Sequence, residues 1–387
     1  MDRSYFDHNA TTPISPEVLE VHVQALLEVY GNASSIHHHG QTAKQKLETA
    51  RRQVCDLVGC KPRQAVFLSG GTEADNLAIF GRVCRHTGAY RHVITTAIEH
   101  PAVLSPCARL EREGVTVTYV RPGPDGIVDP DEIRRAMRPH TVLISVMHVN
   151  NEVGTIQPIA EITDIAHDAG VLMHSDGVQA AGRIPIEIES LGVDLYSISG
   201  HKLYAPKGIG VLFILKGTKL QPLILGGRHE QERRGGTENV PGAVALGAAA
   251  VQAKADLEQE MQRLATLRDR LEQGVVNAVP GVTVNGDRRR RVPNTTNLCF
   301  EGIEGEAMVI ALDLRGFSVS SGAACSSGVI EPSHVLMAMG LSREQARSSV
   351  RFSLGRSNTM EQVDALIEAA AEAASHLRRI SPTYANA

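Results

Sequence analysis

The chain has 387 residues, of which 42% are hydrophobic and 21% are charged, a composition typical of a globular protein. Its formal net charge of −4 argues against a basic whole-protein field for binding nucleic acid. No segment approaches the roughly 18 consecutive apolar residues of a membrane span, and the first residues contain no apolar signal segment, so we expect a cytoplasmic protein.

Between residues 62 and 215, short apolar runs alternate with stretches of helical pattern. A helix is expected from Thr72, and strands are expected at residues 65–68, 92–96, 115–120, 142–146, 171–174, 195–198 and 210–215. Strands that are apolar on both faces and separated by helices indicate a mostly parallel, doubly wound α/β sheet. The ligand site is then expected at the carboxyl ends of the strands.

The last third of the chain has a different pattern. A helix is expected over residues 248–272, followed by strands at 295–300 and 349–354 and a helix at 360–379. We therefore predict a large α/β domain at residues 15–258 and a smaller α+β domain made of residues 1–14 and 259–387. The four arginines at 288–291 are expected to form a solvated loop rather than a nucleic-acid contact.

The cysteines are few and unpaired in the sequence. They are Cys55, Cys60, Cys84, Cys107, Cys299 and Cys325, and none belongs to a C-x-x-C pair. A disulfide framework or metal cage from this chain alone is not expected. Five lie in apolar or helical contexts, which predicts a packing role. Cys325 is instead surrounded by Gly, Ala and Ser, which predicts an accessible loop at about residues 320–332.

Three polar motifs each follow a predicted strand. Gly70, Gly71 and Thr72 combine glycines with a hydroxyl at a helix start, a pattern that suits a phosphate but also fits a simple helix cap. Asp176 and Lys202 follow two later strands, 26 residues apart in the sequence. A carboxylate, a lysine and a phosphate cup at one sheet edge are what pyridoxal 5′-phosphate needs.

Two further side chains follow strands in the same region. His100 fits either a helix cap or a group that stacks on a cofactor ring or shuttles protons. Asn151 lies in the segment Val149-Asn150-Asn151-Glu152. Each motif is weak alone, but their common position after strands favours a single site.

Short motifs along nearly the whole chain resemble those of cysteine desulfurases of the NifS/IscS type, which are fold-type I pyridoxal-phosphate enzymes of the class V aminotransferase family. The matching segments are residues 7–12, 31–37, 71–73, 99–100, 149–152, 176–179, 199–202, 234–239, 320–326 and 350–356. The cofactor-binding residues that the resemblance implies are Gly71, Thr72, His100, Asn151, Asp176, Gln179, Ser199, His201, Lys202 and Thr237.

The resemblance also implies individual roles. Lys202 would bond to the cofactor, Asp176 would pair with its pyridine nitrogen, and His100 would stack on its ring. Gln179 and Asn151 would contact the oxygen side of the ring, and Thr72, Ser199 and His201 would bind the phosphate. Thr237 would reach the phosphate of a neighbouring subunit, which implies a homodimer. Arg351, with Asn32 nearby, would anchor the substrate carboxylate.

The implied reaction converts L-cysteine to L-alanine. Lys202 would abstract the α-proton, and the Cys325 thiolate would attack the substrate sulfur. The resulting persulfide would pass to an acceptor protein for iron–sulfur cluster or thio-cofactor assembly. Cys325 could also ligate an iron–sulfur cluster transiently with a partner, whereas direct nucleic-acid or membrane partners are not expected.

Several alternatives stay open. A selenocysteine lyase or an aminotransferase would share the lysine and the aspartate, but an aminotransferase does not need a nucleophilic thiol. A sulfur-acceptor or scaffold protein would need neither. The run of residues 37–39 is all histidine, yet three consecutive side chains cannot face one metal, so we expect His37 in an active-site loop. The chain ends at Ala387 without the long extension that IscS-type members use to dock a cluster scaffold, which favours a NifS-like or housekeeping enzyme.

Overall fold

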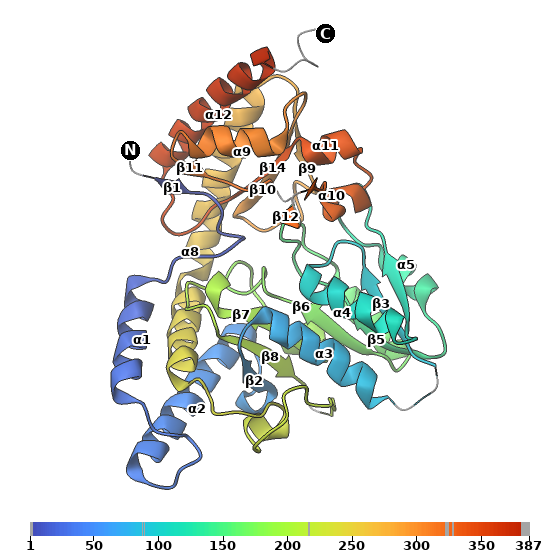
Figure 1. Cartoon of the computed structure of the whole chain (residues 1–387), viewed down its shortest axis with the longest axis vertical. Helices are drawn as coiled ribbons and strands as arrows, with labels where there is room; N and C mark the ends of the chain where they lie inside the picture. The colour runs from blue at the N-terminus through green and yellow to red at the C-terminus, as the bar shows by residue number, and fades with distance from the viewer. Residues whose placement is uncertain are drawn as a thin grey trace.

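A computed structural model describes residues 3–86, 88, 90–215, 217–321, 325–326 and 329–380, and of residues 325–326 and 329–330 it describes the backbone alone. The chain forms two parts, one on a seven-stranded sheet and one on a three-stranded sheet, and the long helix α8 (Val240–Ala278) extends from one to the other (Figure 1). None of the helices in the described residues has the length and apolar character that crossing a membrane requires.

The larger sheet confirms the predicted strands. It contains β2 (Ala65–Leu68), β3 (His92–Thr96), β4 (Thr116–Val120), β5 (Thr141–Ser145), β6 (Leu172–Asp176), β7 (Leu195–Ser199) and β8 (Gly210–Ile214), in the order β2-β8-β7-β6-β5-β3-β4. Strand β8 runs antiparallel to both of its neighbours, so β2 points the same way as β3 to β7. The carboxyl ends of the parallel strands therefore meet at one edge.

Helices cover both faces of this sheet, as a doubly wound fold requires. Val93 and Ile94 are consecutive buried residues of β3 that belong to different core clusters. The Ile94 side packs against α2 (His38–Val58), α6 (Ile159–Asp168) and the first half of α8. The Val93 side packs against α3 (Gly71–Arg85) and α4 (Pro101–Arg112). The remaining elements of this part are α1 (Pro16–Glu28), η1 (Pro62–Gln64), α5 (Pro130–Ala136), α7 (Ile188–Leu191), η2 (Gly200–Lys202) and η3 (Glu230–Glu232).

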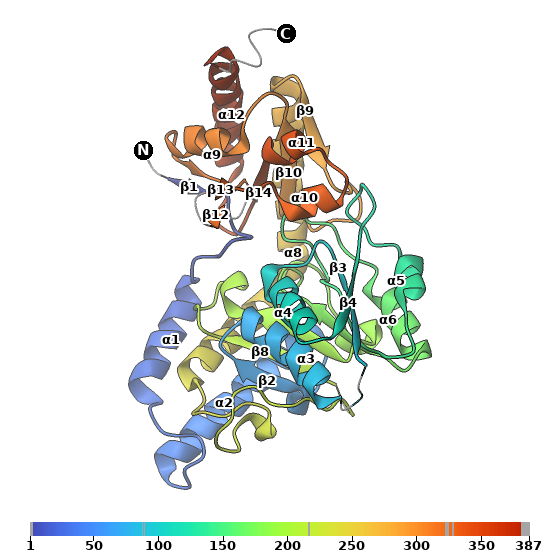
Figure 2. The ribbon, with the colours of Figure 1, turned by 45° about the vertical axis from the view of Figure 1, so that its right-hand side comes forward.

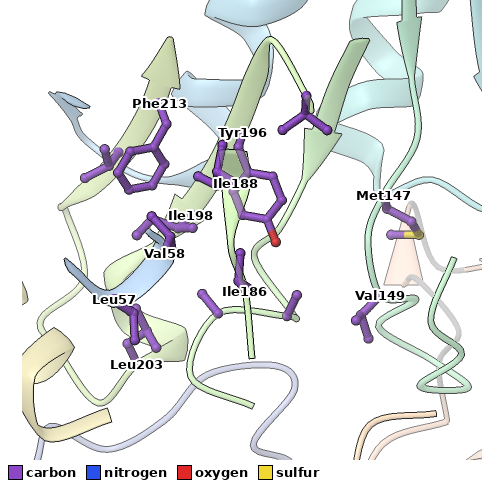
Figure 3. Close-up of a cluster of buried hydrophobic side chains, with 14 of the residues drawn as sticks. Leu57, Val58, Met147, Val149, Ile186, Ile188, Tyr196, Ile198, Leu203 and Phe213 are labelled. Carbon is purple, nitrogen blue, oxygen red and sulfur yellow. The ribbon is translucent and has the colours of Figure 1, made fainter. Parts of the chain in front are cut away.

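Tyr196 belongs to the core cluster on the Ile94 side of the sheet. Its ring is fully buried near Ile186, Ile188 and Ile198 (Figure 3), and its hydroxyl lies 2.8 Å from Nδ1 of His148. A Cβ atom at Gly177 would lie 2.0 Å from this ring. Glycine at 177 therefore allows the backbone to pass close to the Tyr196 ring, immediately beyond Asp176.

Helix α8 is longer than the predicted span of residues 248–272. Asn239 caps its first turn, with Oδ1 accepting from the Gly242 N–H at 3.0 Å. A Cβ atom at Gly247 would lie 2.9 Å from the Ala50 Cα. Gly247, just before the predicted start of the helix, therefore lies inside α8, where it allows α8 to pack closely against α2.

The smaller part has its own core. Strands β9 (Val282–Asn285), β10 (Thr295–Phe300) and β14 (Ser349–Ser353) form an antiparallel sheet, with α9 (Gly305–Asp313), α10 (His334–Ala338), α11 (Arg343–Arg347) and α12 (Met360–Ile380) around it. Phe6 packs into this core with Phe352, and β1 (Ser4–Tyr5) pairs with β11 (Phe317–Ser318). Figure 2 shows β1 beside this part and α1 beside the larger sheet. The domain boundaries at residues 14 and 258 stay a prediction.

Candidate active site

A cavity of about 310 Å³ lies at the carboxyl ends of β2, β6 and β7 and reaches Arg351 of the smaller sheet. It contains most of the residues that the sequence predicted to act together. The predicted residues that line it are Gly71, Thr72, His100, Asn151, Asp176, Gln179, Ser199, His201, Lys202 and Arg351.

Lys202 lies in η2, directly after β7. Its Nζ donates hydrogen bonds to the backbone carbonyls of Asn9 and Ala10, the latter at 2.6 Å. Burial, together with the positive charges of Arg183 and Arg351, lowers the pKa of Lys202 to about 7. An amine with this pKa is partly neutral at physiological pH, so it can act as a base or a nucleophile.

Asp176 lies at the carboxyl end of β6. Its Oδ1 accepts a hydrogen bond from the Val178 N–H at 2.9 Å. Burial and the neighbouring carboxyl group of Asp75 raise the pKa of Asp176 to about 7. This carboxyl group can therefore hold or release a proton near neutral pH.

A buried polar group that sequence reasoning missed lies behind Asp176. His174 places Nδ1 2.8 Å from Ser145 Oγ and Nε2 3.0 Å from Ser197 Oγ. Asp75 Oδ1 lies 3.5 Å from the same Nε2, and burial raises the pKa of Asp75 to about 7. The sequence could have indicated Asp75, because it follows Thr72 by three residues and so lies on the same face of α3.

The start of α3, where the sequence predicted either a phosphate cup or a simple helix cap, lines the cavity. A Cβ atom at Gly71 would lie 2.8 Å from Val178 Cγ2 and 3.4 Å from Ser199 Cβ, so a side chain here would close part of the cavity. The first N–H groups of a helix are free to bind an anion. The capping interpretation also holds in part, because Glu73 Oε2 accepts from the Ser69 N–H at 2.7 Å.

His100 has the predicted capping role and also lies at the cavity. Its Nδ1 accepts from the Ala102 N–H at 3.1 Å and so caps α4, while the side chain lines the cavity. Desolvation in the cavity and the charge of Lys202 lower the pKa of His100 to about 4. The ring is therefore neutral at physiological pH.

Arg351 lies on β14 and is nearly buried. Its Nη2 lies 2.7 Å from Asp7 Oδ1, and its Nη1 donates to the Asn151 carbonyl at 2.9 Å. Its Nε is buried without a hydrogen-bond partner among the described residues. Asp7, which sequence reasoning does not place in the site, therefore fixes the guanidinium at the cavity wall.

Asn32 and Thr237 do not line this cavity. Both are exposed: Asn32 lies between α1 and α2 with Oδ1 accepting from the Ser34 N–H at 2.9 Å, and Thr237 follows η3. His37 caps α2, accepting from the Gly40 N–H at 3.3 Å, and is not part of the cavity of its own chain. Among the described residues, no three His, Cys, Asp or Glu side chains are grouped as a metal site.

Glu230 fixes the segment that leads to Thr237. It is buried, and its carboxylate pairs with Arg51 at 2.7 and 2.8 Å and accepts from the Phe67 N–H at 2.9 Å. The backbone of Glu230, Gln231 and Glu232 has positive φ, so the segment needs such an anchor.

Glu230→Ala is expected to lower the free energy of unfolding by about 3–5 kcal/mol, because it leaves Arg51 buried and unpaired. Urea denaturation measures the change. Glu232→Ala is the matched control, since Glu232 has the same backbone geometry but an exposed ion pair with Arg228, whose loss should change stability little. Equal effects of the two substitutions would contradict the anchoring role.

Cys325 lies in β12 (Cys325–Ser326), which pairs with β13 (Val329–Ile330). Its thiol and residues 322–324 and 327–328 of the predicted loop lie outside the described residues, as do the chain-end residues 381–387. Cys55, Cys107 and Cys299 are buried and Cys60 is partly buried, in line with packing. Cys84 differs from the prediction, because it is exposed on α3.

Comparison with known proteins identifies the family of this chain. Residues 4–366 match the family model described as aminotransferase class-V. A cysteine desulfurase IscS of Dictyoglomus turgidum is 44% identical over 98% of this chain and 96% of that protein. A solved structure of a NifS-like protein has a TM-score of 0.91 and 37% identity, covering 97% of this chain and all of that one. Another, described as SspA in complex with cysteine, has a TM-score of 0.81 and 34% identity over 90% of this chain and 98% of that one.

Proposed function

We propose a division of roles within the cavity, from the premise that this chain belongs to the class V aminotransferase family and is a cysteine desulfurase of the IscS/NifS type. The observation that carries the proposal is the convergence of Lys202, Asp176 and the first turn of α3 on one cavity. The family uses pyridoxal 5′-phosphate, and this set of groups fits that cofactor.

Different residues would hold the two ends of the cofactor. The glycine cup at Gly71 with Thr72, Ser199 and His201 would hold the phosphate, and the buried Asp176 would pair with the pyridine nitrogen. Lys202 would bond to the cofactor covalently, His100 would lie against the face of its ring, and Asn151 and Gln179 would contact the oxygen side of the ring. When bound, the cofactor supplies an electron-withdrawing ring that stabilises negative charge at the substrate α-carbon.

Lys202 is the proposed general base. Its Nζ would take the α-proton of the substrate, and its lowered pKa supports this role because the neutral amine is available near pH 7. Asp176 would hold a proton at the pyridine nitrogen of the cofactor. The network of Asp75, His174 and Ser197 would fix the position of Asp176.

Arg351 is the proposed anchor for the substrate carboxylate. Asp7 and the Asn151 carbonyl hold its guanidinium at the cavity wall, which supports a two-point contact with a carboxylate. Because cysteine is bound by a related protein, SspA, L-cysteine is the proposed substrate.

Arg351→Lys is expected to raise the KM for L-cysteine roughly 10- to 100-fold, because one or more charged hydrogen bonds are lost. Steady-state alanine formation measures it, with the absorbance of the bound cofactor as a check on the cavity. Arg343→Lys, an exposed arginine paired with Glu331, is the control. An unchanged KM in Arg351→Lys would show that the carboxylate binds elsewhere.

Cys325 is the proposed sulfur acceptor. Its thiolate would attack the substrate sulfur, so that an S–S bond forms while the C–S bond breaks. The electron pair of the broken bond stays with the substrate carbon, which takes a proton and leaves as alanine. Its backbone pairs with Ile330, and Ser320, five residues earlier in the chain, forms a β-bridge with Arg351, which supports a position for Cys325 near the substrate anchor.

A homodimer is the proposed active form. Asn32 and Thr237 lie outside the cavity of their own chain, and both are exposed. Large apolar side chains are exposed on the same part of the chain: Leu26, Leu27, Tyr30, Ile36 and Leu225. A second copy that covers them would bring Asn32 and Thr237 to the partner's cavity.

The products test this function. Purified protein with pyridoxal 5′-phosphate and L-cysteine is expected to form one alanine for each sulfur transferred. A keto acid as product would indicate an aminotransferase, and turnover only with L-selenocysteine would indicate a selenocysteine lyase. A protein that neither binds the cofactor nor forms alanine would be a sulfur acceptor or scaffold. The acceptor, its iron–sulfur or thio-cofactor pathway and the cytoplasmic location stay predictions.

A further inference from the structure

A second, smaller cavity lies behind Lys202. Its volume is about 30 Å³, and Lys202 lines both this cavity and the larger one. Its other polar lining residues include His8, Arg183, Tyr204, Arg356 and Asp256. Lys202 therefore borders two spaces, the larger of which is the proposed cofactor and substrate site.

His8 presents an unsatisfied polar ring to the second cavity. The residue is 1% exposed, and neither ring nitrogen has a hydrogen-bond partner among the described residues. The Tyr5 carbonyl lies near the ring but outside hydrogen-bond geometry for either nitrogen. Buried polar groups are almost always hydrogen-bonded, to protein or to ordered water, so this ring requires a partner.

The packing around His8 holds the ring in place. The ring lies edge-on to Tyr5 with centroids 4.9 Å apart, and a Cβ atom at Gly355 would lie 2.3 Å from it. Burial and the charge of Arg183 lower the pKa of His8 to about 4. The neutral ring has one N–H donor and one acceptor nitrogen, which suits a group that passes protons.

The cavity has the size and polarity for water. A cavity needs about 10–15 Å³ of such space for one water molecule, so this one can hold about two. His8, Lys202 and Arg183 offer the several polar partners that a buried water requires. On the outer side, Arg356 Nη2 lies 3.4 Å from Asp256 Oδ2, and the Asp256 side chain is 44% exposed. The cavity therefore extends from the lysine towards solvent.

We propose that the second cavity binds ordered water between Lys202 and His8, and that this water exchanges the protons of the Lys202 amine with solvent during turnover. The proposal rests on the proposed role of Lys202 as the base. One proton leaves the Lys202 ammonium for the water while another returns from it, so the charge on Lys202 is unchanged. His8 is a positioning residue, because it holds the water and does not touch the substrate.

The holoenzyme tests this with L-cysteine deuterated at the α-carbon. In the wild type, exchange at Lys202 is expected to wash out most of the label before alanine is released. In His8→Phe, which keeps the ring but removes its nitrogens, the fraction of deuterium retained at the alanine α-carbon should rise at least about twofold, because the label then competes only with the other hydrogens of one ammonium group. The fraction reflects the competition between exchange at Lys202 and return of the label to the α-carbon, so the rate of alanine formation is measured in parallel for each variant.

Two variants complete the test. His8→Gln restores a donor and an acceptor and should return the retained fraction towards the wild-type value. Tyr5→Phe alters a neighbour of His8 that lies outside the cavity lining, and it should leave the fraction unchanged. Equal retention in wild type and His8→Phe would overturn the proposal while leaving the function intact. Alanine formation by Lys202→Ala within a few-fold of the wild-type rate would instead overturn the proposed role of Lys202 as the base.

A measurement without substitution covers the case in which His8→Phe does not fold. Diffraction from the native holoenzyme at high resolution is expected to show an ordered water within hydrogen-bond distance of a His8 ring nitrogen. A dry second cavity in that structure would overturn the proposal.

Discussion

Lys202→Ala is expected to lower the rate of alanine formation by roughly 10²- to 10⁴-fold, the contribution of a positioned general base. The substitution removes the amine that would take the α-proton and the bond that would hold the cofactor. Steady-state alanine formation at saturating L-cysteine and cofactor measures the loss. Because the pKa of Lys202 is lowered to about 7, the neutral amine becomes populated as pH rises through 7, and wild-type activity should rise over the same range.

Lys207→Ala is the control, because Lys207 is an exposed lysine five residues away in the chain. It should keep the wild-type rate. A Lys202→Ala enzyme within a few-fold of the wild type would exclude the lysine as the base.

Cys325→Ser is expected to reduce alanine formation from L-cysteine to background while the absorbance of the bound cofactor is retained. Serine keeps the size of the side chain, but its hydroxyl cannot accept the substrate sulfur to form a persulfide. Alanine analysis after incubation with L-cysteine measures the loss, and the absorbance shows that the cavity is intact.

Cys84→Ser controls for the loss of a thiol in general. Cys84 is an exposed free cysteine on α3, and its substitution should leave alanine formation unchanged. If Cys325→Ser still turns over L-cysteine at the wild-type rate, another group accepts the sulfur.

Much of the larger sheet and its site could be predicted because both depend on local pattern. A parallel strand buried on both faces appears as a short apolar run, and this pattern predicts β2 to β8. Residues that follow parallel strands converge at one edge, so the sequence alone places Thr72, Asp176 and Lys202 together. The family and the fold were confirmed by the comparisons.

Contacts between distant segments could not be predicted from pattern. Asp7 pairs with Arg351 across 344 positions, and His8 reaches the second cavity from the same N-terminal segment. The sequence assigns residues 1–14 to the smaller domain, but no local pattern indicates that Asp7 and His8 reach the site. The contacts of Asn32 and Thr237 could not be predicted for another reason, because their proposed partners lie on another copy of the chain.

Intact-protein mass spectrometry after addition of L-cysteine, followed by peptide mapping, identifies the residue that carries the sulfur. We expect a mass increase of one sulfur atom that maps to the peptide containing Cys325 and is removed by a reducing agent. Alanine formation with the sulfur on another cysteine, or with no sulfur on the protein, would contradict it.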